Sequence, residues 1–540
     1  MELPSKFFMK FLLTLLIFLL IHSNIKAQNV IYSKMESFSN GTNSPKFEII
    51  GKVESNILVH LFDKKHYLKI YDNDMNQINK IILDFIPKNI NGIQFIGYTN
   101  CCIIIWERIE AQKVIYEYAK INLNGDLIGD VSNLDTINYA NFQTKKIDIR
   151  DIKLLISEDK NKIALSIFGI KEDTVQINSK IFNADFKILD INTVKVGNYN
   201  KDSDFLNDFL INNNGDLVFS FSNKIRGLLV NYFQIFVKKI NSEKLYDINL
   251  QNDTIQLLNT TFTINNKNEE YILTALNIDT AEKNIKGIYF AKIPFWELNK
   301  DESVKNIHFI KNIPFKKIKK TFKNYSLLDF EVQMRNDGGC SIVVSKLNNF
   351  NNYYSEYKKN QLDRSYNLPI TTFGAFECDI NRGYFNTLSQ TEIIQIQRDT
   401  FNRPKNWPYS LPNLAIEPSD IILLNVSKDG SLINDTTFQI PTNLKIDRQK
   451  ISFMRDYFIN FFTITVTKRN INLIAFTKNL NEQSLMNEFK IFGDDDKLDK
   501  KIIKVRDDYY FDLLSSKQID NNELIMPFFR NNRIGFAKVF

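Results

Sequence analysis

The stretch Phe290-Ala291-Lys292-Ile293 recurs at the end of the chain as Phe536-Ala537-Lys538-Val539, and in looser form as Tyr118-Ala119-Lys120-Ile121. Each copy is short and built from apolar, β-branched or aromatic residues, which favour strands. Similar strand patterns begin near residues 67, 179, 236, 421 and 475. Neighbouring copies are roughly 50 to 60 residues apart, except for the gap from residue 290 to residue 421, which is more than twice as long.

Most copies run into a turn and then into a further apolar strand. Asn124-Gly125, Asn214-Gly215 and Asp429-Gly430 are strong hairpin signals, because glycine accepts a positive φ without steric cost. No long stretch has the apolar spacing of an amphipathic helix. Short strands joined by hairpins at this period are typical of the blades of a β-propeller.

The sequence therefore predicts an all-β fold, a single antiparallel β-propeller of eight blades, with seven blades as the alternative. The chain stops at Phe540 just as its strand pattern finishes, and a strand within Val30–Lys34 would complete that blade. Pairing of the N- and C-terminal strands would close the ring and remove an exposed sheet edge. An outer-membrane β-barrel is less favoured, because runs such as Ile103–Ile105 lack the dyad alternation of barrel strands.

Residues 1–27 have the pattern of a secretory signal peptide. Lys6 and Lys10 precede the apolar run Phe11–Ile21, and Ala27 is a small residue at the expected cleavage point. The apolar run is too short to span a membrane as a helix. The sequence thus predicts a secreted, periplasmic or cell-surface protein with no transmembrane segment after cleavage.

Residues 28–540 are predicted to form the propeller domain, with residues 347–419 as an insertion within one blade, which accounts for the long gap. Removal of residues 1–27 takes away Lys6, Lys10, Lys26 and Glu2, so the formal net charge falls from +7 to +5. That charge is nearly neutral for a chain of this length and argues against a nucleic-acid partner. With 44% hydrophobic and 24% charged residues, the chain is not intrinsically disordered.

Several short patterns carry a resemblance to a known family. They are Lys26-Ala27-Gln28, Asp337-Gly338-Gly339, Ile421-Ile422-Leu423-Leu424 leading to Asp429-Gly430, Glu523-Leu524-Ile525, and Gly535-Phe536-Ala537-Lys538-Val539-Phe540. On these residues the chain resembles a family of secreted Bacteroidota proteins of unknown function with a β-propeller-like fold. The resemblance implies that fold and export, and it implies no activity.

The predicted insertion holds the first candidate binding residues, Phe401, Trp407 and Tyr409, which lie among four of the twelve prolines of the chain. Proline fixes φ, and a stiff loop bearing aromatic side chains loses little entropy on binding a sugar or a peptide. The alternative is a long loop folded onto the propeller, with Trp407 buried as its anchor.

Lysines form the second candidate binding group. Lys316, Lys317, Lys319 and Lys320 lie close together and alternate with apolar residues. They could form a basic patch for an anionic glycan or a lipid headgroup. The favoured interpretation is a blade edge whose lysines discourage pairing with another strand.

Cysteine and histidine give weaker signals. Four cysteines are too few for a disulfide scaffold, although Cys101 or Cys102 could pair with Cys340 or Cys378 in an oxidising compartment, with the pairing left open. His60 and His66 flank a tight turn, where the two imidazoles could approach each other. Too few ligands surround them for a metal site, so they are interpreted as hairpin residues. No metal site and no cofactor are predicted.

The sequence contains no recognisable nucleophile, metal or phosphate-binding motif. It therefore predicts an exported, non-catalytic binding or scaffold protein that uses one propeller face and the 347–419 insertion to bind an unknown protein or glycan. The alternative is a glycan-active enzyme whose carboxylates converge at the central channel, a possibility that rests on fold analogy alone. No catalytic residue is assigned.

Overall fold

A computed structural model of the chain describes residues 30–38, 46–111, 113–200, 204–224, 229–249, 256–279, 284–295, 309–314, 328–334, 339–347, 418–429, 431–438, 462–466, 470–478, 484–492, 498–503, 505–506, 509–513, 515–520, 523–530 and 533–540. Within these ranges the strands form antiparallel sheets, and the single α-helix is α2 (Tyr139–Thr144). The predicted all-β, antiparallel class is confirmed.

Three four-stranded sheets form the N-terminal part. The first sheet contains β3 (Lys46–Val53), β4 (Asn56–Asp63), β5 (Lys65–Tyr71) and β6 (Gln77–Ile82). The second contains β7 (Gly92–Gly97), β8 (Cys102–Glu110), β9 (Lys113–Ile121) and β10 (Ser132–Asn138). The third contains β11 (Asp148–Ile156), β12 (Lys162–Lys171), β13 (Thr174–Asn183) and β14 (Ile188–Val196). In each, strands adjacent in sequence are hydrogen-bonded neighbours.

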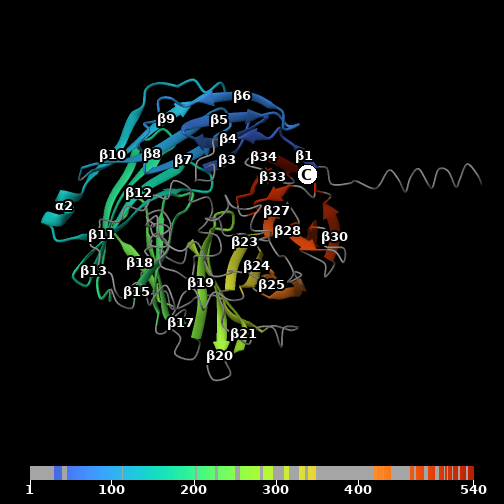
Figure 1. Ribbon diagram of the computed structural model, residues 1–540. Coiled ribbons are helices and arrows are strands. Elements are labelled where there is room, and N and C mark those ends of the chain that lie inside the picture. Colours follow the sequence, from blue (N-terminus) through green and yellow to red (C-terminus); the bar gives the residue numbers. More distant parts are fainter. Residues whose placement is uncertain are drawn as a thin grey trace, which may run out of the picture.

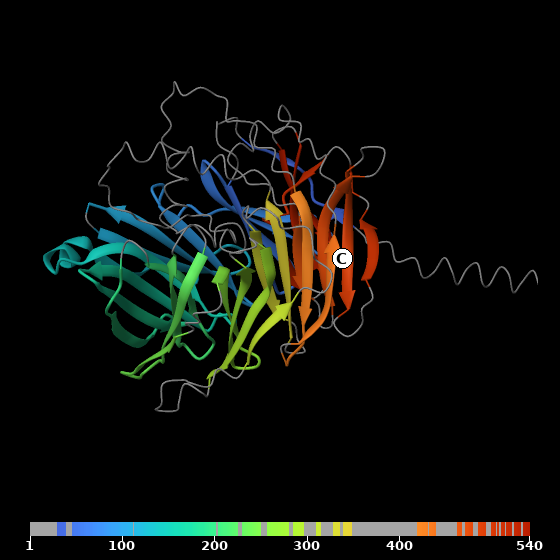
Figure 2. The ribbon, with the colours of Figure 1, turned by 90° about the horizontal axis from the view of Figure 1, so that it is seen from below.

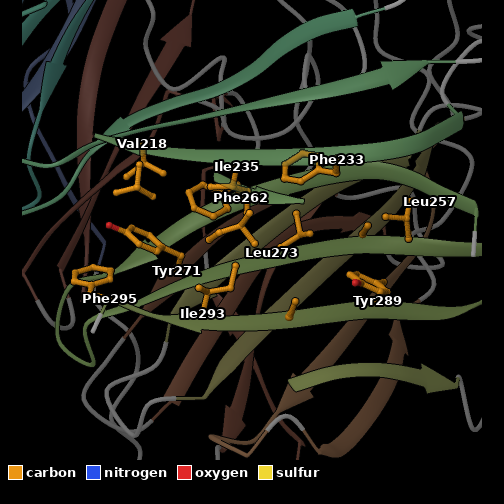
Figure 3. Packing of buried hydrophobic residues seen from close by; sticks show 14 residues of the cluster. Val218, Phe233, Ile235, Leu257, Phe262, Tyr271, Leu273, Tyr289, Ile293 and Phe295 are labelled. Atoms are coloured by element: carbon orange, nitrogen blue, oxygen red, sulfur yellow. The ribbon is translucent and has the colours of Figure 1, made fainter. Parts of the chain in front are cut away.

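An eight-stranded sheet follows. Its first half contains β15 (Asp204–Ile211), β16 (Leu217–Lys224), β17 (Leu229–Lys238) and β18 (Leu245–Asn249). Its second half contains β19 (Gln256–Asn265), β20 (Glu270–Asp279), β21 (Asn284–Pro294) and β22 (Phe309–Pro314). The two halves share only the pairs Leu229–Leu258 and Val230–Leu257. A hydrophobic cluster then packs residues of one half, such as Phe233, against residues of the other, such as Phe262 and Tyr271 (Figure 3).

Three further sheets complete the described fold. The first of them contains β23 (Leu328–Met334), β24 (Cys340–Leu347), β25 (Pro418–Val426) and β26 (Leu432–Phe438). The next is β27 (Phe462–Val466), β28 (Asn470–Lys478), β29 (Ser484–Phe492) and β30 (Leu498–Ile503). The terminal sheet holds β31 (Tyr510–Phe511), β32 (Lys517–Asp520), β33 (Glu523–Arg530), β34 (Arg533–Val539), β1 (Val30–Tyr32) and β2 (Glu36–Ser37).

The sheets follow one another around the molecule in chain order, from the blue first sheet to the red terminal sheet (Figures 1 and 2). The first strands of neighbouring groups contact each other. Strand β3 contacts β7 and β32, strand β15 contacts β11 and β19, and β19 also contacts β23. The last strands β6 and β14 are largely exposed at the periphery. Apolar side chains are buried between successive sheets, so the core is divided into layers that lie between sheets.

The two ends of the described chain share one sheet. Val30 in β1 pairs with Val539 in β34, and the strands run antiparallel. Phe529 and Phe536 of this sheet pack with Phe47 of the first sheet. Glu36 then reaches the first sheet, where its carboxylate lies 2.9 Å from Lys69 Nζ. The N-terminal segment therefore joins the last sheet to the first.

The repeated motif, of which Phe290–Ile293 is one copy, lies on the third strand of its group of strands, with one exception. The copies at residues 67, 118, 179, 236, 290, 421 and 536 fall on β5, β9, β13, β17, β21, β25 and β34. The copy assigned at residue 475 is wrong in this respect, because Ala475 lies on β28, the second strand. The third strand there is β29, whose Phe489-Lys490-Ile491 is the better match. Both strands are apolar, so strand composition alone did not distinguish them.

The lysine of this motif is buried in several copies and paired with a carboxylate. Lys69, Lys292 and Lys538 are almost fully buried. Their Nζ atoms lie 2.9 Å from Glu36, 3.4 Å from Glu270 and 3.5 Å from Glu523, respectively. A buried ammonium group is costly unless it is paired. The carboxylate comes from a neighbouring strand of the same sheet for Lys292 and Lys538, and from β2 of the terminal sheet for Lys69.

Candidate functional site

The strand order gives the molecule two different faces. Because the strands of each sheet alternate in direction, the turns after first and third strands lie at one face, and these are hairpins within sheets. We call this the turn face. The opposite face, which we call the connection face, carries every described link from one sheet to the next, including α2. It is also where β24 ends at Leu347 and β25 begins at Pro418.

The turn face uses one hairpin turn repeatedly. In the turn from Asn122 to Asp126, the Asn122 Oδ1 atom accepts hydrogen bonds from the backbone N–H groups of Asn124 and Asp126, and Gly125 has φ of 81°. Turns beginning at Asp72 and Asn183 have the same two side-chain-to-backbone bonds, and in the turn beginning at Asn212 the side chain accepts a bond from the Asp216 N–H. These side chains satisfy backbone donors that the hairpin leaves unpaired. The predicted turns at Asn124-Gly125 and Asn214-Gly215 are confirmed.

Hydrogen bonds join these turns from sheet to sheet. The Glu54 N–H donates to the Thr99 carbonyl at 3.1 Å, which links the first and second sheets. The Tyr98 hydroxyl donates to the Lys160 carbonyl at 2.7 Å, which links the second and third. The chain of bonds continues through the Asp159 N–H to Asn213 Oδ1 at 3.1 Å, and through the Asn213 N–H to Asn266 Oδ1 at 2.9 Å. The polar groups of the turn face are thus used for structure.

The connection face has a buried polar cluster between the second and third sheets. It consists of Glu107 on β8, Tyr116 on β9, Tyr139 at the start of α2, and Asp151 and Lys153 on β11; we call it the Glu107 cluster. Glu107 is 2% exposed and Asp151 is 6% exposed. Glu107 lies near the end of β8, and Asp151 near the start of β11, so both lie toward the connection face.

Hydrogen bonding leaves part of this cluster unsatisfied. Glu107 and Tyr116 are cross-strand partners, and the Tyr116 hydroxyl donates to Glu107 Oε2 at 2.8 Å. Glu107 Oε1 and the Tyr139 hydroxyl are buried without a hydrogen-bond partner. Lys153 Nζ lies 3.5 Å from Asp151 Oδ2. Buried polar groups are normally paired, so unpaired ones in a folded protein call for an explanation.

Burial raises the pKa of Glu107, the hydrogen bond from Tyr116 lowers it, and the nearby Asp151 raises it, so that the pKa lies at about 7. The pKa of Tyr116 is raised by burial and by Glu107. The pKa of Tyr139 is raised by burial and by the two carboxyl groups. Glu107 therefore exchanges its proton near neutral pH, as a group used in acid–base or switching chemistry would.

A second buried carboxyl group lies on β15. Burial raises the pKa of Asp208 to about 7, although hydrogen bonds from Ser220 and from the backbone of Phe262 lower it. The chain bulges here, between Leu206 and Phe209. A bulge between Ile149 and Asp151 lies on β11 as well. Bulges redirect side chains. Each of these two bulges includes an acidic residue, Asp208 on β15 and Asp151 on β11, and each strand is the first of its group.

His60 and His66 form a stacked pair at the connection-face end of the first sheet. His60 Nε2 and His66 Nδ1 are 3.0 Å apart, and the rings are nearly parallel. Burial lowers the pKa of His60 well below its usual value, and His66 lowers it further. The predicted approach of the two imidazoles is confirmed. In the described part of the chain no group of three or more His, Cys, Asp or Glu side chains could hold a metal ion.

The structure describes few of the residues selected from sequence. Phe401, Trp407, Tyr409, Lys316, Lys317, Lys319, Lys320 and Cys378 lie outside the described ranges, as does the signal peptide. Cys101 and Cys102 are buried free thiols, and Cys340 is buried on β24. The disulfide of Cys101 or Cys102 with Cys340 or Cys378, whose pairing the sequence left open, stays a prediction. No helix in the described ranges is long and apolar enough to cross a membrane.

Sequence reasoning missed Glu107, although the sequence carried a signal. Glu107 directly follows the apolar run Ile103–Trp106 and precedes Ile109. A glutamate that continues a buried strand is almost never fully buried unless it has a partner. Its partners, Tyr116 and Asp151, lie on other strands, and their proximity follows from the packing of the sheets.

No protein-family model matches the chain, and no curated protein matches it either. Among solved structures, the chain is similar to prolyl oligopeptidase B from Galerina marginata, with 7% identity, 93% of this chain and 55% of that chain covered, and a TM-score of 0.36. The chain thus spans about half the length of that protein. The resemblance to Bacteroidota proteins stays a prediction.

Two further solved structures are β-rich. An apocarotenoid oxygenase from Synechocystis has 9% identity over 89% of this chain and 94% of its own, with a TM-score of 0.31. A thermostable family-43 glycoside hydrolase has 12% identity over 47% of this chain and 92% of its own, with a TM-score of 0.21.

Proposed function

We propose that the chain is an exported, single β-propeller of eight blades that binds a protein or glycan ligand on its connection face. Eight groups of four neighbouring strands support the blade number, if the eight-stranded sheet is counted as two blades and β1 as the outer strand of the last. The narrow link within that sheet and the hydrophobic layer between its halves support the division. A view down the axis by electron microscopy that shows seven blades would overturn the count.

The difference between the two faces carries the binding proposal. On the turn face, the turns described above bond to one another and hold neighbouring sheets together. The connection face carries the described links between sheets, the strand ends Leu347 and Pro418 between which residues 348–417 are inserted, and the Glu107 cluster. Binding residues are found mostly on loops that a rigid scaffold positions, and long loops are often functional.

A deletion tests the role of the insertion. Leu347 and Pro418 are cross-strand partners, so a short Gly-Ser linker can replace residues 348–417 without separating β24 from β25. The matched control is Asn124→Ala, an exposed substitution on the turn face. Both variants and the parent are exposed to an immobilised glycan panel and used for affinity capture from an envelope fraction. We expect the deletion to lose ligands that the control retains, and equal recovery by all three would refute the proposal.

One observation favours a second candidate function, that of a glycan-active enzyme. Glu107 and Asp151 place two carboxyl groups in one cluster, and a pKa of about 7 suits Glu107 to act as a general acid. Both groups are nearly inaccessible, so a substrate could reach them only if α2 moved. Assays of the parent and of Glu107→Gln on a glycoside panel decide: hydrolysis by the parent alone would establish this function.

A further inference from the structure

The position of Glu107 links its protonation to the helix α2. Tyr139 is the first residue of α2 and is part of the Glu107 cluster, where its hydroxyl has no hydrogen-bond partner. None of the six residues of α2 is fully buried, and Asn138 caps the helix by accepting a hydrogen bond from the Ala140 N–H. Phe142 packs with Tyr139 against the apolar layer between the second and third sheets. A short, exposed helix held by two aromatic side chains costs little to release.

The charges around Glu107 favour its neutral form. The groups that face it are Tyr116 from β9, Tyr139 from α2, and Asp151 with Lys153 from β11. Lys153 Nζ lies 3.5 Å from Asp151 Oδ2, and no ion pair between Glu107 and another described side chain is present. An ionised Glu107 would therefore place a second negative charge near Asp151 in an environment from which water is excluded.

We propose that Glu107 is a proton-controlled latch for α2: the neutral acid allows Tyr139 and α2 to stay packed against the apolar layer between the second and third sheets, and the carboxylate releases them. The carboxylate needs hydration, and the cheapest way to admit water is to move Tyr139, because the remaining walls of the cluster are sheet strands. The connection face therefore has two states, closed in acid and open above neutral pH.

Hydrogen exchange of α2 measures the latch directly. Peptides covering residues 135–147 are followed by mass spectrometry at about pH 5.5 and about pH 8, with the rates corrected for intrinsic chemistry. Burial raises the pKa of Glu107 to about 7. At about pH 8 the ionised form therefore outnumbers the neutral form roughly tenfold. We expect the corrected protection of α2 to fall by about that factor between the two conditions.

Two variants separate the latch from general loosening. Glu107→Gln keeps the shape of the neutral acid, so α2 should stay protected at both pH values. Glu54→Gln, on an exposed glutamate in the turn between β3 and β4, should behave as the parent does. Peptides around Asp208 should keep their own pH dependence in Glu107→Gln.

The proposal is overturned if parent α2 protection does not change with pH, or if Glu107→Gln shows the same change as the parent. The first outcome needs no variant, so the test stands even if Glu107→Gln folds poorly. The measurement uses no ligand, and its failure would leave the proposed binding function in place.

Discussion

The turn face and the connection face end the same strands in different ways. On the turn face, side chains such as Asn122 and Asn213 pair with nearby backbone and with the next sheet. Buried side-chain atoms without a partner among the described residues occur at both faces, such as Asn265 Nδ2 and Asn268 Nδ2 at the turn face. At the connection face such atoms belong to an acid, Glu107, and to Tyr139 of α2. Satisfied polar groups rigidify a structure, whereas unsatisfied ones store free energy that a proton, a ligand or a movement can release. The difference suggests a scaffold on one face and a responsive surface on the other.

The largest expected effect is on the turn face. Gly125 has φ of 81°, and an added Cβ would lie 2.6 Å from Ile81 Cδ1. Gly125→Ala should therefore lower the free energy of unfolding by about 3 to 4 kcal/mol, from backbone strain and overpacking together. Gly129→Ala is the matched control, because Gly129 has φ of 82° with open space around it. It should cost about 1 kcal/mol, and equal losses by denaturant unfolding would contradict the packing of this turn against the first sheet.

The next effect concerns the pH dependence of stability on the connection face. The folded pKa of Glu107 is raised above its unfolded value, so its contribution to stability is greatest in acid and is lost as the pH rises through about 7. Between about pH 5.5 and 8 this loss is on the order of 2 kcal/mol. Glu107→Gln should remove that part of the fall in denaturant titrations.

Two other buried groups affect the same titrations and need separate variants. Asp208, whose pKa is also raised to about 7, should produce a similar fall that Asp208→Asn removes. His60, whose pKa is lowered by burial, acts in the opposite direction, because its protonation destabilises the folded state as the pH falls below its usual value. If Glu107→Gln left the pH dependence of the free energy of unfolding unchanged, the proposed role of Glu107 on the connection face would be wrong.

The smallest effect compares two copies of one turn. Asn212 is fully buried and bonds to Asp216 and to Tyr271, whereas Asn122 makes the corresponding bonds in a more exposed turn. Asn212→Ala should lower the free energy of unfolding by about 2 kcal/mol, and Asn122→Ala should lower it by about 1 kcal/mol. A buried partner left without its hydrogen bond is destabilised more than one that water can reach. Thermal unfolding of the two variants measures the difference, and a larger loss for Asn122→Ala would contradict it.

Local patterns predicted much of the fold. Gly125 and Gly215 predicted turns because glycine accepts a positive φ, and both residues have a positive φ in the structure. The alternation of apolar strands with such turns indicated antiparallel sheets. The one misplaced copy, at Ala475, shows the limit: two neighbouring apolar strands look alike, and only their pairing order distinguishes second from third. The candidate site was missed for a related reason, since Glu107, Tyr139 and Asp151 are far apart along the chain.

By itself, the sequence determined the strands, their hairpins and the period of their repetition, because these depend on residues close together along the chain. It also placed a lysine in most copies of the repeat. The tertiary structure alone decided which carboxylate neutralises each buried lysine, and that Glu107 lies beside Asp151. The Glu107 cluster forms between two sheets, where low dielectric and exclusion of water change the pKa of a carboxyl group that would be ordinary in solution.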